Sequence, residues 1–228
     1  ATLHTSECNT HKTYVFMMLA TVLFIALAFT GTFGTWQALV LLVALSYVLF
    51  DAFRDAHKHR KGAALAANED EEEVEGADPN MPWWQIIVFL LLGLIGLPLG
   101  ADLLVDNASL IAREYGVSET VIGLTLVALG TSLPELATTT MAALRRQADV
   151  ALGNVIGSNM FNLLAIIGVA ALIGPIPVAP EFLRFDLWVM LGASVLLVPF
   201  VFWRWNITRA WGIGLFVAYA AYIGIVIF

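Results

Sequence analysis

The chain has 228 residues, of which 60% are hydrophobic and 13% charged, and its formal net charge at pH 7 is −7. Soluble domains carry about 25% charged residues, so this composition excludes an ordinary soluble protein and predicts a membrane protein. The acidic balance argues against nucleic acid as a partner, and the single cysteine, Cys8, excludes an internal disulfide.

Apolar stretches recur along the chain at the length of membrane-spanning helices, which need roughly 20 apolar residues. Seven stretches approach this length: residues 14–30, 36–53, 83–105, 119–144, 151–174, 186–203 and 209–228. One of them could be a buried helix of a large soluble protein, but seven in so short a chain could not. We therefore predict an all-α membrane protein with about seven transmembrane helices.

The first stretch, 14–30, has two interpretations. Lys12 precedes it and the residues Ala-Leu-Ala at 26–28 resemble a cleavage site, as in a secretory signal peptide. However, MMLATVLF at 17–24 is faintly similar to MLGASVLL at 190–197. This similarity favours a transmembrane helix that recurs near the end of the chain.

An internal repeat of this kind would organise the whole chain. Residues 83–228 would form one complete five-helix repeat, and residues 1–53 would be the last two helices of a preceding repeat. A repeat with an odd number of helices is inverted relative to its copy, which places a binding site at the bilayer midplane. The chain also begins at Ala1 rather than at methionine. We therefore expect a C-terminal portion of a longer protein, whose N-terminal repeat is a partner of this one.

The polar stretch 54–82 begins basic and then turns acidic, with seven carboxylates between residues 69 and 78. Their spacing does not match an EF-hand loop, so we interpret the stretch as a solvated linker between two membrane bundles, with a cation sensor as the alternative. If this linker is cytoplasmic, nine of the eleven basic residues are cytoplasmic, and only Arg113 and Arg184 are not. The positive-inside rule thus predicts that the C-terminus lies outside. We also expect an integral protein of the plasma (inner) membrane.

The fourth stretch contains residues that a bilayer tolerates poorly. Its centre, GTSLPE, places Pro134 and Glu135 side by side. An ionised carboxylate at this depth costs roughly 2.5–3.5 kcal/mol on the insertion scale, and proline removes a backbone donor. No arginine, lysine or histidine lies at comparable depth in the seven stretches, so a structural ion pair explains Glu135 poorly.

A helical face accounts for these residues better. Ala128, Thr131, Ser132 and Glu135 occupy positions i, i+3, i+4 and i+7, and so lie on one face. Pro134 leaves carbonyls near Ala128 without their usual donor, and such carbonyls persist at membrane depth where they face a cavity. A carboxylate, two hydroxyls and a carbonyl form an all-oxygen ligand set for a hard cation.

The fifth stretch carries a second polar face, with Asn154, Ser158 and Asn162 spaced at i, i+4 and i+8. Gly153 and Gly157 would let another helix approach closely. These polar residues could simply join helices, but opposite a buried carboxylate we interpret Ser158 and Asn162 as further ligands. Calcium takes six to eight oxygens, whereas this repeat offers four or five and one negative charge, so a second carboxylate must come from a mirrored repeat.

The two motifs together resemble a known family. GTSLPELATTT at 130–140, followed by ALGNVIGSNMFNLL at 151–164, closely resembles the second signature repeat of the calcium/cation antiporter superfamily, in its sodium/calcium exchanger branch. The resemblance covers residues 120–172 and implies two inverted five-helix repeats. It implies that Glu135 binds calcium and that the other ligands are the hydroxyls of Thr131, Ser132 and Ser158 and, for sodium, the carbonyl of Ala128.

Two details of the motifs bear on the driving ion. Asn162 stands where potassium-dependent relatives have aspartate, which argues against potassium transport. Glu135 lies in GTSLPE, whereas the proton-coupled branch has its key glutamate in a GNxxE pattern. We therefore predict sodium-driven calcium exchange by alternating access. The alternatives are a calcium/proton antiporter, a passive cation pore and a non-transporting fragment, while no motif predicts an enzyme or a cofactor.

The third stretch is the candidate moving element. LLLGLIGLPLGADLLV at 90–105 contains three glycines and Pro98, which weaken a helix and permit it to slide along a neighbour. A kinked packing helix is an equally good interpretation. We expect Asp102 and Asp106, near the outer end, to be solvated rim residues rather than ligands.

Overall fold

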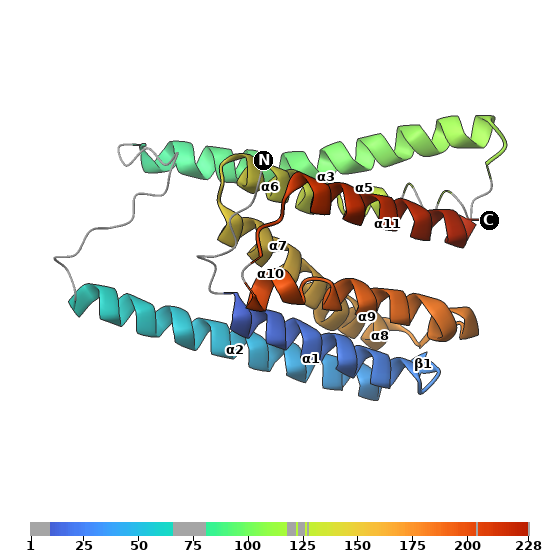
Figure 1. Ribbon diagram of the computed structural model, residues 1–228, viewed down its shortest axis with the longest axis horizontal. Coiled ribbons are helices and arrows are strands. Elements are labelled where there is room, and N and C mark those ends of the chain that lie inside the picture. The colour runs from blue at the N-terminus through green and yellow to red at the C-terminus, as the bar shows by residue number, and fades with distance from the viewer. Residues whose placement is uncertain are drawn as a thin grey trace. The chain divides into compact units, whose positions relative to one another are not determined.

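The computed structural model describes residues 10–65, 81–117, 122, 126, 128–203 and 205–227. The chain divides into two compact units, each built from segments that are distant in sequence. Unit 1 contains residues 74–151 and 207–228, and unit 2 contains residues 5–73 and 152–206. The predicted five-helix segment 83–228 therefore contributes to both units, and its boundaries as a repeat stay a prediction. Figure 1 shows the elements of both units.

Unit 2 is a helical bundle with one short pair of strands. Its elements are α1 (His11–Ala28), β1 (Thr32–Phe33), α2 (Thr35–Leu65), most of α7 (Ala148–Phe161), the π-helix η3 (Asn162–Ile166), α8 (Ile167–Ile173), β2 (Ile176–Pro177), the π-helix η4 (Phe182–Asp186), α9 (Leu187–Val195) and α10 (Val198–Phe202). Helix α1 packs against α2, α9 and α10, and α2 packs along α8. The α1 segment thus forms part of the bundle, as expected for a transmembrane helix.

The hydrophobic core of the protein lies in unit 2. Tyr14, Met17, Leu41, Ile156 and Leu187 are each at most 2% exposed and belong to one cluster. They come from α1, α2, α7 and α9, so each helix contributes its inward face. The glycine in α8 that allows its tight packing is Gly168, because a Cβ there would lie 3.0 Å from the Leu42 side chain of α2.

Polar contacts close one end of unit 2. The side chain of Gln37, only 4% exposed, donates to the Thr30 hydroxyl (2.9 Å) and the Thr32 carbonyl (2.6 Å) and accepts from the Gly34 amide (2.9 Å). Strand β1 pairs antiparallel with β2, with Phe33 opposite Ile176. A buried polar group costs little only when it is paired, and here a single amide fixes the connection between α1 and α2.

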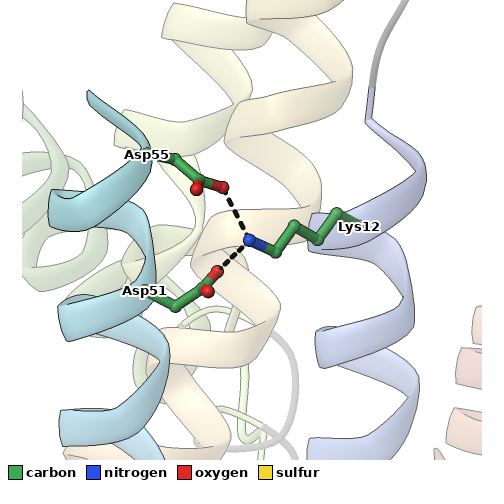
Figure 2. Close-up of polar contacts among 3 residues, drawn as sticks. All are labelled: Lys12, Asp51 and Asp55. Atoms are coloured by element: carbon green, nitrogen blue, oxygen red, sulfur yellow. Dashed lines mark hydrogen bonds and ion pairs between the residues drawn. The ribbon is translucent and has the colours of Figure 1, made fainter. Parts of the chain in front are cut away.

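An ion cluster joins the other ends of α1 and α2. Figure 2 shows the Lys12 ammonium of α1 between two carboxylates of α2. It lies 2.5 Å from Asp51 and 2.6 Å from Asp55. The two aspartates are four residues apart, so they lie on one face of α2, and Lys12 offsets their mutual repulsion.

Unit 1 is built differently. Its elements are α3 (Trp83–Glu114), α5 (Ala128–Thr131), α6 (Leu133–Leu144) and α11 (Arg209–Ile227). Helix α3 contacts α5 and α6. Along α3 only Ala101 and Ser109 are buried, although the helix consists largely of leucine, isoleucine and valine. A helix that is apolar all round yet largely exposed within its unit is typical of a membrane span.

The described helices confirm the predicted class and refine the spans. Five helical segments are long and apolar enough to cross a membrane: His11–Ala28, Thr35–His57, Trp83–Glu114, Ala148–Ile173 and Phe182–Phe202. Helix α2 continues to Leu65, into the predicted linker, because residues 54–65 contain good helix formers and no proline. The acidic run at 69–78 lies outside the described residues. The stretch 119–144, which is described only in part, is not one continuous helix.

Candidate cation site

The GTSLPE segment forms a helix break. Helix α5 ends at Thr131 and α6 begins at Leu133. The Ser132 amide donates to the carbonyl of Leu129, three residues back (3.1 Å), and the Leu136 amide donates to the Ser132 carbonyl (2.9 Å). Pro134 lies in the first turn of α6, where a missing backbone donor costs least. The prediction of a single helix through this segment is therefore wrong.

The break places Glu135 at the beginning of a helix rather than in the middle of one. Glu135 is in the first turn of α6 and half-buried, and its Oε2 atom is buried. The amino end of a helix carries about half a positive elementary charge, which stabilises a carboxylate there by about 0.3–1 kcal/mol. Sequence reasoning missed this, although a proline that precedes an acidic residue indicates a helix start.

Thr131 and Ser132 lie at the break itself, and both side chains are exposed. Because the Ser132 amide bonds three residues back, the α-helical pattern that would bring this amide to the Ala128 carbonyl is interrupted. The Thr138 hydroxyl donates to the carbonyls of Pro134 (3.0 Å) and Glu135 (3.1 Å). The backbone at the start of α6 is thus hydrogen-bonded locally.

A cavity of about 240 Å³ lies in unit 1 between α3 and the break. It is lined by Pro98, Ala101, Asp102, Val105, Asp106, Gly130, Thr131 and Pro134. Asp102 and Asp106 are exposed, as expected of rim residues, yet they share this cavity with Thr131. The sequence did not reveal this, because only tertiary packing brings residues from α3 and α5 to one cavity.

Ser158 and Asn162, the remaining predicted ligands, belong to unit 2. The Ser158 side chain is half-buried, and its hydroxyl donates to the Val155 carbonyl of the same helix (3.2 Å), which leaves its lone pairs as acceptors. Asn162 is exposed and is the first residue of η3. Single π-helical turns inside α-helices occur frequently at functional sites.

Within unit 2, the described residues show no close approach at Gly153 or Gly157, where one was expected. A Cβ added at either glycine would meet no described atom within 4 Å. In the described part of the chain, the tight contact of this kind near the predicted ligands is at Gly130 in unit 1. Small residues permit close packing but do not specify it, so the spacing of glycines along one helix was a weak signal.

The predicted ligands therefore fall into two groups. Ala128 and Thr131 lie on α5, Ser132 lies at the break and Glu135 lies on α6. The convergence of these residues with the ligands of unit 2 stays a prediction. The described residues contain no group of three or more histidine, cysteine, aspartate or glutamate side chains that could hold a metal. A site built from the predicted ligands would combine one glutamate with hydroxyl, amide and carbonyl oxygens, which are the ligands of hard cations.

Comparison with known proteins identifies the family of this chain. Residues 85–228, which include both motifs, match the family model of the sodium/calcium exchanger protein. The chain belongs to the sodium/calcium exchanger family. It is therefore a helical membrane protein, and the resemblance found in GTSLPE and GNVIGSN is confirmed at the level of the family.

Individual members of the sodium/calcium exchanger family match different lengths of the chain. The sodium/calcium exchanger MaX1 of Methanosarcina acetivorans is 48% identical over 117 residues, which are 51% of this chain and 33% of MaX1. The inner membrane protein YrbG of Escherichia coli is 33% identical over 201 residues, which are 87% of this chain and 60% of YrbG.

Solved structures show the same fold. The sodium-calcium exchanger NCX_Mj, soaked with 10 mM Na⁺ and 10 mM Sr²⁺, matches 95% of this chain with a TM-score of 0.69 and 30% identity. The match covers 65% of that chain. The chain thus spans about a third of MaX1 and less than two thirds of YrbG and NCX_Mj.

Proposed function

We propose that this chain provides one half of the ion site of a cation antiporter that uses sodium to drive calcium across a membrane. The observation that carries the proposal is the position of Glu135, in the first turn of α6 directly after a helix break that presents two hydroxyls. Membrane transporters use discontinuous helices of this kind to bind ions at the midplane. The Ala128 carbonyl, Thr131, Ser132, Ser158 and Asn162 would supply the other oxygens.

Charge balance determines what this half would need. One carboxylate neutralises half of the charge of a calcium ion, and the remaining charge is costly in a medium of low dielectric constant. A second carboxylate, from an inverted repeat, would complete both the charge and the six to eight oxygens that calcium takes. A sodium ion needs no such second charge, so the same oxygens could hold sodium and calcium in turn.

Sodium is supported as the driving ion by the motif and by the relatives. Glu135 stands in GTSLPE and Asn162 carries no charge, so the site offers neither the proton-coupled pattern nor the extra aspartate of potassium-dependent relatives. MaX1 is described as a sodium/calcium exchanger, and NCX_Mj as a sodium-calcium exchanger. Each of these names supports sodium for the present chain.

Alternating access would require one element to move past the ligands. Helix α3 is the candidate, since it contains Pro98 and packs against α5 and α6. A Cβ at Gly93, Gly96 or Gly100 would meet no described atom within 4 Å, so these glycines are not held by neighbours. The movement of α3 would expose Thr131 and Glu135 to one side of the membrane at a time.

Calcium-45 uptake into proteoliposomes with an imposed sodium gradient tests the proposal. The chain alone is compared with a two-repeat version, in which the first three helices of a full-length relative precede it, so that residues 1–53 would complete the first repeat. Glu135→Gln keeps the shape of the side chain and removes its charge. Glu114→Gln is the matched control, because Glu114 is an exposed carboxylate at the end of α3.

We expect sodium-dependent uptake from the two-repeat version, its loss in Glu135→Gln and its retention in Glu114→Gln. Uptake that follows a pH gradient instead of the sodium gradient would assign the chain to calcium/proton exchange. Uptake without any counter-ion gradient would indicate a passive pore. Sodium-dependent uptake that survives Glu135→Gln would contradict the proposed role of this residue.

A further inference from the structure

The tightest contact near the proposed ligands is between Val105 of α3 and Gly130 of α5. A Cβ built on Gly130 would lie 1.8 Å from Cγ2 of Val105 and 3.3 Å from its Cβ. Carbon atoms in contact are about 3.5–4.0 Å apart. No residue larger than glycine therefore fits at position 130 while Val105 stays where it is.

This contact lies at a position that affects the proposed site. Both residues line the cavity of about 240 Å³ that also includes Thr131, the residue next to Gly130. On α3, Asp102 and Asp106 flank Val105 and line the same cavity. The distance between these carboxylates and Thr131 therefore depends on how closely Val105 approaches Gly130.

We propose that Val105 and Gly130 are a positioning pair, whose combined size sets the width of the cavity in front of Thr131. The inference rests on the proposed function to the extent that Thr131 is taken as an ion ligand. Valine suits this role because its branched side chain is held in few rotamers and so acts as a rigid spacer. Glycine suits it because the valine methyl groups then contact the α5 backbone directly.

A purely structural role for Gly130 makes a different prediction. If the glycine were needed only for the backbone of α5, a substitution at Val105 could not compensate for Gly130→Ala. If the pair sets a distance, Val105→Ala removes the methyl group that lies 1.8 Å from the added Cβ and leaves a tight but tolerable 3.3 Å contact. The double substitution then restores the geometry that either single substitution disturbs.

Cysteine labelling measures the width of the cavity without depending on transport. Cys8→Ser removes the single native cysteine, and Thr131→Cys places a thiol in the cavity wall. The rate of reaction with a water-soluble maleimide is then measured in detergent for the parent, Gly130→Ala, Val105→Ala and the double variant. Gly100→Ala is the matched control, because a Cβ at this glycine of α3 meets no described atom within 4 Å.

We expect Gly130→Ala to displace α3 and raise the labelling rate at least fivefold, and Val105→Ala alone to raise it at least twofold. The labelling rate of the double variant should return to within twofold of the parent rate. The rate of Gly100→Ala should also lie within twofold of the parent rate. A double variant that labels like Gly130→Ala would overturn the proposal. If Gly130→Ala does not fold, an unchanged rate in Val105→Ala would overturn it as well.

Transport by the two-repeat version, with Thr131 intact, separates this inference from the proposed function. We expect Gly130→Ala to raise the KM for calcium at least fivefold, with a smaller change in maximal flux, and Val105→Ala to reverse the effect. If the labelling rates follow the expected pattern but no version shows sodium-dependent flux, the positioning pair is supported and the proposed function is contradicted.

Discussion

Units 1 and 2 solve the problem of polar groups in a membrane protein in opposite ways. In the membrane-spanning segment of α1, in unit 2, 44% of the residues are buried. The polar side chains of Gln37 and Lys12 are paired at the two ends of the bundle. In the membrane-spanning segment of α3, in unit 1, only 6% of the residues are buried. In the same unit, Glu135 lies on α6 beside a helix break, and Asp102 of α3 lines a cavity. The buried core is thus concentrated in unit 2, whereas the proposed carboxylate ligand lies in unit 1.

Truncation of an apolar side chain should have the largest effect on stability, and only in unit 2. Leu41→Ala removes a side chain that is 0% exposed and should lower the free energy of unfolding by about 2–5 kcal/mol. Leu94→Ala, on α3, removes one that is 68% exposed and should change it by less than about 0.5 kcal/mol. Unfolding in detergent, followed by circular dichroism, measures both. Equal losses would mean that the core does not lie mainly in unit 2.

Glu135→Gln should show the reverse behaviour, with a loss of transport and no loss of stability. Loss of a residue that only supports a metal ligand typically reduces activity by about 10- to 100-fold. Removal of a direct ligand should cost at least as much, so we expect sodium-dependent calcium flux to fall by about 100-fold. A neutral side chain avoids the roughly 2.5–3.5 kcal/mol cost of a charge at membrane depth, which exceeds the roughly 0.3–1 kcal/mol from the helix dipole. The thermal unfolding midpoint should therefore stay or rise. A clear fall would indicate that Glu135 is a structural residue.

Gln37→Leu should destabilise unit 2 by an intermediate amount. The substitution removes three hydrogen bonds and leaves the Gly34 amide and the Thr32 carbonyl without this partner. The expected loss is about 1–3 kcal/mol in the free energy of unfolding. Gln85→Leu, near the beginning of α3, is the control and should have little effect. If both substitutions behave alike, the polar network does not hold the connection between α1 and α2.

Lys12→Met should have the smallest effect, since exposed ion pairs contribute little. The substitution leaves Asp51 and Asp55 next to each other without their shared cation. The unfolding midpoint should fall slightly at low salt, and the difference should disappear at high salt, where surface charges are screened. Restoration of the midpoint by Asp51→Asn in the Lys12→Met chain would confirm that like-charge repulsion is the cause. A salt-independent difference would instead indicate loss of packing by the lysine stem.

Most of the fold was predictable because membrane helices leave long apolar stretches in the sequence. The motif GTSLPE made Glu135 and its hydroxyl neighbours the candidate ligands, because a carboxylate in such a stretch has few structural explanations, and their role stays a prediction. The helix ends were less predictable. Helix α2 continues to Leu65 and α3 to Glu114, since a helix does not stop where its apolar residues end.

The sequence by itself determined the class of the protein and its family, and it predicted oxygen ligands, because these depend on composition and on residues close together in the chain. Tertiary structure decided which residues from distant segments share a cavity, as Asp102 and Thr131 do. It also decided that Gly130 makes a close contact with a neighbouring helix, through Val105 of α3. The reason is physical, since a contact between helices depends on how their side chains interlock, and periodicity within one helix does not specify its neighbour.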